Sequence, residues 1–280
     1  MPSSTNLPSA PASPVRVALI GFGEAGEKFA RSANWQGHAR GWDILPERRA
    51  LMARYGVESA DSAEAALADC GVLLSLVTAD AALEAARQYA ALLPEGSFWC
   101  DMNSVSPDTK RQAAALVEAG GGRYVDVAVM APVDAALAVP LLLAGPHAAG
   151  VEPLLAALGF SNTRVVGDAL GKASAIKMIR SVMIKGIEAL SDECASAADA
   201  AGVFDEVMAS LDASEKTAGW AEKVAYNRER MEVHGLRRAA EMEESARTLE
   251  GLGIEPVMTR GTIVRQRRAA KSKDKGKEAA

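Results

Sequence analysis

Three glycines near the N-terminus have the spacing of a phosphate-binding loop. An apolar run over 15–20 leads directly into a G-x-G-x-x-G motif, and a helical pattern follows. In this motif the first glycine permits a tight turn, the second lets the backbone approach a pyrophosphate, and the third allows the helix to pack closely on the sheet. The N-terminus of the helix attracts the anion. The sequence therefore predicts a dinucleotide-binding loop, formed by Gly21, Phe22, Gly23, Glu24, Ala25 and Gly26.

An acidic residue at the end of the next predicted strand is placed to hold the ribose of the dinucleotide. Asp43 occupies this position. A carboxylate accepts hydrogen bonds from both ribose hydroxyls and repels a 2′-phosphate, so Asp43 favours NAD over NADP. Arg40, Arg48 and Arg49 lie nearby in sequence and could hold that phosphate, which keeps NADP as the alternative. Alternatively, Asp43 has only a structural role, as an acidic residue in the turn before Pro46.

Polar residues also follow two other predicted strands. In doubly wound folds the ligand lies in the crevice at the carboxyl ends of the strands. By this position we expect Val77 and Thr78 to flank the ribose next to the nicotinamide, and Asn103 and Ser104 to lie at the same crevice. Turn and capping chemistry is the alternative, and Ser106, which precedes a proline, is a typical helix N-cap.

A polar stripe follows one face of a long helix predicted over 173–201. Lys177, Ser181, Lys185 and Glu188 are spaced by four, four and three residues, so they share that face. The rest of the helix is mostly apolar, which indicates burial, and unpaired buried charge is costly. The stripe either lines a cleft between cofactor and helical domain, with Ser181 and Lys185 toward the substrate, or forms ion pairs such as Lys185 with Glu188.

A second polar cluster lies in the C-terminal part of the chain at helical spacing. It contains His234, Arg237, Arg238 and Glu241. Arginine binds carboxylates in bidentate fashion, and histidine exchanges protons near neutral pH. We therefore treat His234 and Arg237 as candidate substrate contacts, with surface ion pairs or a subunit contact as an equally good explanation.

Strands and helices alternate through the first half of the chain. Strands separated by helices need crossover connections, which predicts an α/β fold with a parallel, doubly wound (Rossmann) sheet over 15–167. Only helical patterns follow, so we expect an all-helical domain over 168–264. Residues 1–14 and the basic segment 265–280 are expected to be disordered tails. The apolar runs that predict strands are 15–20, 71–77, 97–102, 123–129 and 139–145.

Three motifs in one order carry a family resemblance: the loop at 21–26, DMNSVSP at 101–107 and GKASAIK at 171–177. Together they resemble the β-hydroxyacid dehydrogenase superfamily, the group of the 6-phosphogluconate and 3-hydroxyisobutyrate dehydrogenases. Residues 234–259 resemble the helical domain of a phosphogluconate dehydrogenase-like branch of unassigned function. The resemblance implies hydride transfer between NAD or NADP and a hydroxy acid or a related alcohol or carbonyl compound.

The resemblance also implies roles for individual residues. Lys177 is the implied catalytic acid/base, and the loop after the strand at 97–102 is implied to touch the nicotinamide through Asn103 and the substrate through Ser104. Lys177 is chemically suited to its role, because hydride leaves an alcohol carbon only as the hydroxyl proton departs. Desolvation on an apolar helix lowers the pKa of a lysine toward the range where it accepts that proton.

The chain departs from the family pattern in the lysine motif and in the substrate loop. Ala173 replaces a glycine, and Ser181 replaces an asparagine. The Ser-Gly-Gly loop of the family aligns with Met130-Ala131-Pro132, which places an apolar, rigid wall where a hydroxyl and backbone amides are usual. Met130 is still expected beside the substrate. The departure leaves imine or carbonyl reduction as one alternative, and the basic C-terminal segment leaves a non-catalytic NAD(H)-sensing protein as another.

Composition restricts the other classes of function. The net charge of -5 argues against a general nucleic-acid binder, and no apolar run approaches the ~20 residues of a membrane helix. Three scattered cysteines form neither a disulfide framework nor a zinc site, and the start is no secretory signal, so we expect a cytoplasmic protein without metal. The helical domain is small for a self-sufficient core, and family members commonly pair through it, which predicts a homodimer.

Overall fold

The computed structural model describes residues 15–214 and 219–278. The tail expected at 1–14 lies outside these ranges. The chain divides into two compact units, with the boundary between Arg180 and Ser181. The sequence placed this boundary earlier, at 167/168, because the strands stop there; the first turns of the long helix instead pack with the sheet.

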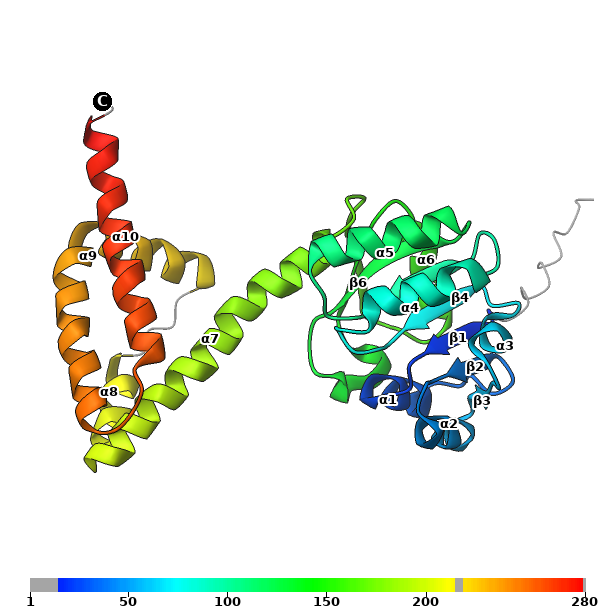
Figure 1. The fold of residues 1–280 in the computed structure, drawn as a ribbon, viewed down its shortest axis with the longest axis horizontal. Coiled ribbons are helices and arrows are strands. Elements are labelled where there is room, and N and C mark those ends of the chain that lie inside the picture. Colours follow the sequence, from blue (N-terminus) through cyan, green and yellow to red (C-terminus); the bar gives the residue numbers. More distant parts are fainter. Residues whose placement is uncertain (1–14, 215–218, 279–280) are drawn as a thin grey trace, which may run out of the picture. The chain divides into compact units, whose positions relative to one another are not determined.

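An eight-stranded sheet forms the centre of the first unit (Figure 1), in the order β3-β2-β1-β4-β5-β6-β7-β8. Alternate residues of β1 face two separate cores, Val17 and Leu19 on one side and Ala18 and Ile20 on the other. This burial on both faces explains why its sequence is continuously apolar. The strands are β1 (Val17–Ile20), β2 (Ala39–Trp42), β3 (Glu58–Ser59), β4 (Val72–Ser75), β5 (Phe98–Asp101), β6 (Arg123–Val129), β7 (Leu141–Ala144) and β8 (Thr163–Gly167).

Helices cover both faces of the sheet, which confirms the doubly wound α/β architecture. One face carries α1 (Glu24–Ser32), α2 (Pro46–Met52) and α6 (Ala148–Ala157). The other carries α3 (Ala63–Leu67), α4 (Ala82–Tyr89) and α5 (Pro107–Ala119), with α4 and α5 side by side in Figure 1. Helix α5 begins as the sequence predicts, with Ser106 Oγ accepting the N–H of Thr109 at 3.2 Å. Short 3-10 turns occur at Ala53–Tyr55, Ala90–Leu92 and Val133–Ala138.

One strand pair departs from the expected parallel arrangement. Strand β7 runs antiparallel to β6, whereas all other neighbours in the sheet are parallel. The connection between β6 and β7 contains the short 3-10 turn Val133–Ala138 and no α-helix, the element that usually forms the crossover between parallel strands. The sheet is therefore mostly parallel, with this one antiparallel pair, and the predicted doubly wound fold class is confirmed.

The second unit is helical, as predicted. It contains the part of α7 (Lys172–Ala201) from Ser181 onward, with α8 (Phe204–Ser214), α9 (Trp220–Gly251) and α10 (Val257–Glu278). Helices α9 and α10 pack closely, because Gly235 is buried against the backbone of Gln266, where a Cβ would clash.

The prediction of a disordered C-terminal tail from residue 265 was wrong through Glu278. Helix α10 continues to that residue, and Gln266 is buried beside α9. The basic composition of this segment reflects its exposed side, where Arg265, Arg267 and Arg268 lie. Composition averages over both sides of a helix, so it did not indicate the side of α10 that packs against α9. Within the described ranges, no helix combines the length and the apolar character that crossing a membrane requires.

Candidate nucleotide site and buried polar network

The first glycine of the loop is required by its backbone and by its neighbours. Gly21 follows β1 with a φ of +89°, and a Cβ on it would lie 2.6 Å from the carbonyl oxygen of Leu76. Its N–H donates to the carbonyl of Trp42 at 2.9 Å. The loop is thus held between the ends of β1, β2 and β4, as the motif predicts.

The second glycine opens the loop toward a ligand. Gly23 is the N-cap of α1, and no described atom lies within 4 Å of a Cβ placed on it. Gly26 is packed more tightly, since a Cβ there would lie 3.2 Å from the carbonyl of Gly21. Phe22 is wholly buried, so it offers a ligand its backbone rather than its ring. Glu24 and Ala25 form the first turn of α1, whose N-terminus faces the open side of Gly23.

Asp43, just beyond β2, is hydrogen bonded to the glycine loop. Its Oδ2 accepts the N–H of Phe22 at 2.6 Å, and its Oδ1 accepts the N–H of Leu45 at 2.9 Å. Arg49 donates to the backbone carbonyl of Asp43 at 2.6 Å and stacks 4.6 Å above the ring of Trp42. Arg40 pairs with Glu58 at 3.2 Å. Two of the three nearby arginines are therefore engaged with other protein groups.

A cavity of about 380 Å³ lies beside the loop and Asp43. Among the residues that line it, Gly21, Gly23, Asp43, Val77 and Thr78 were predicted from sequence. The loop shape, the open Gly23 and the Asp43 carboxylate beside the loop suit a dinucleotide. The other lining residues most relevant to a ligand are Ile44, Leu45, Arg48, Glu84, Gln88 and Tyr89.

The sequence analysis did not find the part of this cavity that α4 provides. Glu84 and Gln88 are four residues apart on one face of α4, and that spacing was the available signal. Ile44 and Leu45 remain 74% and 45% exposed, so two apolar side chains stand beside the cavity in contact with solvent. Ile44 and Leu45, which directly follow Asp43, are suited to cover the flat aromatic base of a nucleotide.

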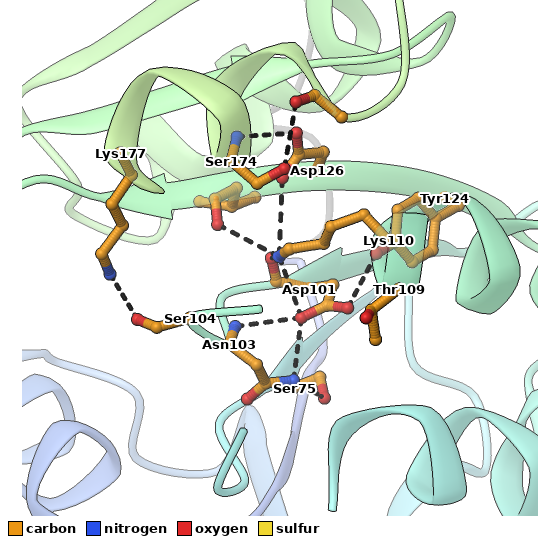
Figure 2. A network of polar contacts seen from close by, with 12 residues as sticks. Ser75, Asp101, Asn103, Ser104, Thr109, Lys110, Tyr124, Asp126, Ser174 and Lys177 are labelled. Carbon is orange, nitrogen blue, oxygen red and sulfur yellow. Dashed lines mark hydrogen bonds and ion pairs between the residues drawn. The ribbon is translucent and has the colours of Figure 1, made fainter. Parts of the chain in front are cut away.

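A buried ammonium group links the neighbouring strands β5 and β6 at their paired residues Asp101 and Asp126 (Figure 2). Lys110 of α5 is completely buried. Its Nζ lies 3.1 Å from Oδ1 of Asp101 and 3.5 Å from Oδ1 of Asp126, and it donates to the backbone carbonyl of Asp101 at 2.5 Å. Both carboxylates are also buried, so a single ammonium is shared between two carboxylates away from water.

Asp101 extends this network toward the loop that follows β5. Its Oδ1 accepts the backbone N–H of Asn103 at 2.9 Å and the side-chain amide of Asn103 at 2.8 Å. The same amide donates to Ser75 at 3.0 Å, and Tyr124 donates its hydroxyl to Oδ2 of Asp101 at 2.7 Å. Burial, together with the Asp101 carboxylate, raises the pKa of Tyr124 well above its usual value, so this hydroxyl remains a donor.

Asp126 extends the network toward helix α7. Its Oδ2 accepts the N–H of Ser174 at 3.0 Å, while the hydroxyl of Ser174 donates to the carbonyl of Gly171 at 3.0 Å. One turn further, Lys177 donates from Nζ to Oγ of Ser104 at 2.5 Å. Figure 2 shows Lys177 extending from α7 toward the loop that carries Ser104. The structure thus brings two predicted site residues together, 73 positions apart in sequence.

Met130 lies directly after β6 and packs in the small cluster that holds the buried Ala173 of α7. Its N–H donates to the carbonyl of Pro140 at 2.9 Å, and Pro132 has no N–H. Ala131 and Pro132 are exposed. The segment 130–132 therefore offers a ligand one backbone amide, that of Ala131, beyond those already paired.

The other predicted substrate contacts belong to the second unit. Ser181 is half-buried in α7, and His234 and Arg237 are exposed on α9. For Lys185 the structure describes the backbone alone, as part of α7. The participation of these four residues in a substrate site remains a prediction.

Sequence reasoning missed the buried network as a whole. Lys110 precedes the buried residues Ala113 and Val117 of α5 by three and seven positions, so helical periodicity places it on the inner face. Asp101 and Asp126 each lie in a run of buried residues. A charged residue at a core position was the signal, and it needed partners that the sequence does not identify.

Two protein-family patterns match the chain. Residues 16–167 match the NAD binding domain of 6-phosphogluconate dehydrogenase, and residues 198–269 match a domain of unknown function, DUF1932. A conserved hypothetical protein of known structure from Sinorhizobium meliloti is 37% identical, with 93% of this chain and 90% of that chain covered and a TM-score of 0.61.

Two further solved structures are similar over nearly the whole chain. A conserved protein of unknown function, reported to be structurally similar to 3-hydroxyacid dehydrogenases, is 29% identical, covers 94% of this chain and 99% of that chain, and has a TM-score of 0.59. An imine reductase from Streptomyces aurantiacus is 21% identical, covers 92% and 95% of the two chains, and has a TM-score of 0.75. At this identity the likeness to the imine reductase shows a shared fold.

Proposed function

The chain belongs to the family of the NAD-binding domain of 6-phosphogluconate dehydrogenase, and from this membership we propose that it is an NAD(P)-dependent oxidoreductase with Lys177 as acid/base. The proposed substrate is a hydroxy acid or a related alcohol or carbonyl compound. The observation that carries the proposal is the 2.5 Å hydrogen bond from Nζ of Lys177 to Oγ of Ser104. This bond supports the proposal because the amine of Lys177, on α7, reaches the loop that follows β5, in the same unit as the glycine loop.

The residues that would hold the cofactor are those that line the cavity. Gly21, Gly23 and the N-terminus of α1 suit the pyrophosphate, and Asp43 suits the adenosine ribose. When bound, the nicotinamide supplies or accepts the hydride. We propose NAD as the preferred form, because the Asp43 carboxylate lines the cavity while Arg40 and Arg49 are engaged with other protein groups. Arg48 also lines the cavity and is the residue that favours NADP.

Lys177 and Ser104 would both take part in proton transfer to or from the substrate. In its neutral form the amine of Lys177 can take the hydroxyl proton of an alcohol, and in its charged form it can return a proton to a carbonyl oxygen. The hydroxyl of Ser104 accepts the hydrogen bond of Lys177 and has its own proton available for the substrate oxygen. Together they would orient the oxygen that gains or loses the proton.

A substrate screen tests this proposal. Hydroxy acids, hydroxyaldehydes and aryl alcohols are incubated with NAD, and nicotinamide absorbance is followed for the natural chain and for Lys177→Met. We expect one class to be oxidised and the variant to lose about 10²–10⁴-fold of the rate, the range for a lost acid/base group. An unchanged rate in Lys177→Met would overturn the assignment. NADH binding without turnover of any substrate would favour the NAD(H)-sensing alternative.

A second candidate reaction is the reduction of an uncharged imine or carbonyl compound. It is favoured by the segment Met130-Ala131-Pro132, in which the Met130 amide is already paired and Pro132 has none. A substrate carboxylate would find few donors there. If this reaction is the physiological one, cyclic imines or aldehydes will be reduced with NADH or NADPH, and added carboxylates will not compete.

We also propose that two copies of the chain associate through the helical unit. Met183, Ile187 and Leu190 follow one face of α7 and are 42–47% exposed. Apolar side chains at spacings of four and three residues form a stripe that a partner helix can cover. Analytical ultracentrifugation at micromolar concentration is expected to give a dimer, and Met183→Glu/Leu190→Glu is expected to give a monomer. A natural chain that sediments as a monomer would refute the association.

A further inference from the structure

Lys110 has no assigned part in the proposed chemistry, although it and Asp126 are the most completely buried charged residues in the described part of the first unit. Its side chain is 0% exposed, and neither it nor Asp126 lines the nucleotide cavity. Buried ion pairs contribute little net stability, because desolvation offsets their attraction. The other contacts of its two carboxylate partners, Asp101 and Asp126, therefore indicate what Lys110 does.

Each carboxylate holds a different segment of the candidate site. Asp101 accepts both N–H groups of Asn103, the residue directly before Ser104. Asp126 accepts the N–H of Ser174, three residues before Lys177 on α7. Lys110 is the common partner of both (Figure 2).

We propose that Lys110 is a positioning residue, which keeps Ser104 and Lys177 within hydrogen-bond distance by holding Asp101 and Asp126 together. The inference rests on the proposed role of Lys177. Lys110 acts through these carboxylates and touches neither substrate nor cofactor.

On the Ser104 side, Lys110 fixes both the side chain and the backbone of Asp101. Its Nζ contacts Oδ1 at 3.1 Å and donates to the carbonyl oxygen at 2.5 Å. The same Oδ1 directs the turn at Asn103, whose amide is also tied to Ser75 of β4. Three neighbouring elements thus determine where the chain places Ser104.

On the Lys177 side, the carboxylate of Asp126 caps the start of α7. A negative charge is favourable at a helix N-terminus, and Oδ2 supplies it to the N–H of Ser174. Oδ1 of Asp126 has no hydrogen-bond partner among the described residues and faces Nζ of Lys110 at 3.5 Å. Without the ammonium, two buried carboxylates would repel each other, and one would move or take up a proton.

The test compares the environment of Lys177 in four proteins: the natural chain, Lys110→Met, Ser104→Ala and Glu193→Gln. The ¹⁵N signal of Lys177 Nζ and its pH titration are measured by NMR, with Lys177→Met for assignment. Ser104→Ala defines the signal when the hydrogen bond is absent. Glu193→Gln is the matched control, because Glu193 is a buried carboxylate that also accepts N–H groups at a helix start, but at α10.

We expect Lys110→Met to shift the Lys177 titration in the same direction as Ser104→Ala and to lower kcat about 100-fold, the size of effect that misplacement by ~1 Å produces. NADH affinity should stay within twofold, and Glu193→Gln should leave the Lys177 signal unchanged. A folded Lys110→Met protein with the natural Lys177 titration and kcat would overturn the proposal.

If Lys110→Met does not fold, Asp126→Asn carries the same test, because its amide oxygen still accepts the N–H of Ser174 while the charge is lost. We expect the same direction of shift, and an unchanged Lys177 titration would again overturn the proposal. Failure of the proposed function is distinguishable. In that case Lys177→Met keeps its turnover, whereas the effect of Lys110 on the Lys177 signal is measured independently.

Discussion

The backbone N–H of Phe22 donates a 2.6 Å hydrogen bond to Oδ2 of Asp43, which lies 21 residues further along the chain. This bond joins the glycine loop to the end of β2. The acid that we propose for the ribose therefore also shapes the loop that we propose for the pyrophosphate. A change at Asp43 is expected to alter nucleotide selectivity as well as affinity.

Asp43→Asn tests the selectivity. The amide keeps an acceptor oxygen for the loop but removes the charge that repels a 2′-phosphate. We expect the ratio of NADPH to NADH affinity to rise by about tenfold, equivalent to ~1.4 kcal/mol. Fluorescence titration with both nucleotides measures the ratio. Glu47→Gln, at an exposed acid on α2 that does not line the cavity, is the control. An unchanged ratio in Asp43→Asn would show that the carboxylate does not select the cofactor.

Changing Gly21 to alanine should mainly reduce stability, whereas changing Gly23 to alanine should mainly reduce nucleotide binding. Gly21→Ala places a Cβ 2.6 Å from the carbonyl of Leu76 at a φ of +89°, so we expect the free energy of unfolding to fall by about 1–3 kcal/mol or more. Gly23→Ala has open space and should fold normally, but its methyl group would occupy the approach of the pyrophosphate. Urea unfolding and NADH titration separate the two effects. Tight NADH binding by Gly23→Ala would place the pyrophosphate elsewhere.

Two of the three cysteines should resist thiol reagents in the folded protein. Burial raises the pKa of Cys70 to about 12, and it raises the pKa of the fully buried Cys100 above its usual value as well. Since the thiolate is the reactive form, neither should be modified at pH 8. Cys194 is half-buried and is expected to react first. Mass spectrometry after brief alkylation, with and without urea, locates the modified residues. Rapid labelling of Cys100 in the native chain would contradict its core position.

Glu193 should make the stability of the helical unit depend on acid pH. Burial alone would raise its pKa, but hydrogen bonds from the Thr259 hydroxyl and from the backbone N–H groups of Met258 and Thr259 outweigh it, and the pKa is lowered. Its stabilisation is therefore present above the usual pKa of glutamate and is lost as the pH falls through the lowered value. Glu193→Gln should lose about 1 kcal/mol at neutral pH. Urea unfolding at several pH values checks this, and equal pH dependence in both proteins would refute it.

Local patterns in the sequence determined much of the fold and one side of the site. Apolar runs and helical spacing identified the doubly wound sheet, and the G-x-G-x-x-G motif located the loop in which Gly21 and Gly23 take different roles. Ser106 was identified as a helix cap by its position before a proline. These features depend on residues within a few positions of one another, so the chain encodes them directly.

The tertiary structure decided which distant residues meet. The contacts of Lys110 with Asp101 and Asp126, and of Asp126 with Ser174, join segments up to 48 positions apart, and no periodicity predicts such partners. The connection before β7 lacks a crossover helix, and that strand is antiparallel to β6. The segment from 265 has the composition of a tail but forms part of α10, which packs beside Gly235. Composition and spacing predict which residues of a helix or strand face inward. The pairing of buried charges, however, depends on distances that exist only after the strands and helices have packed.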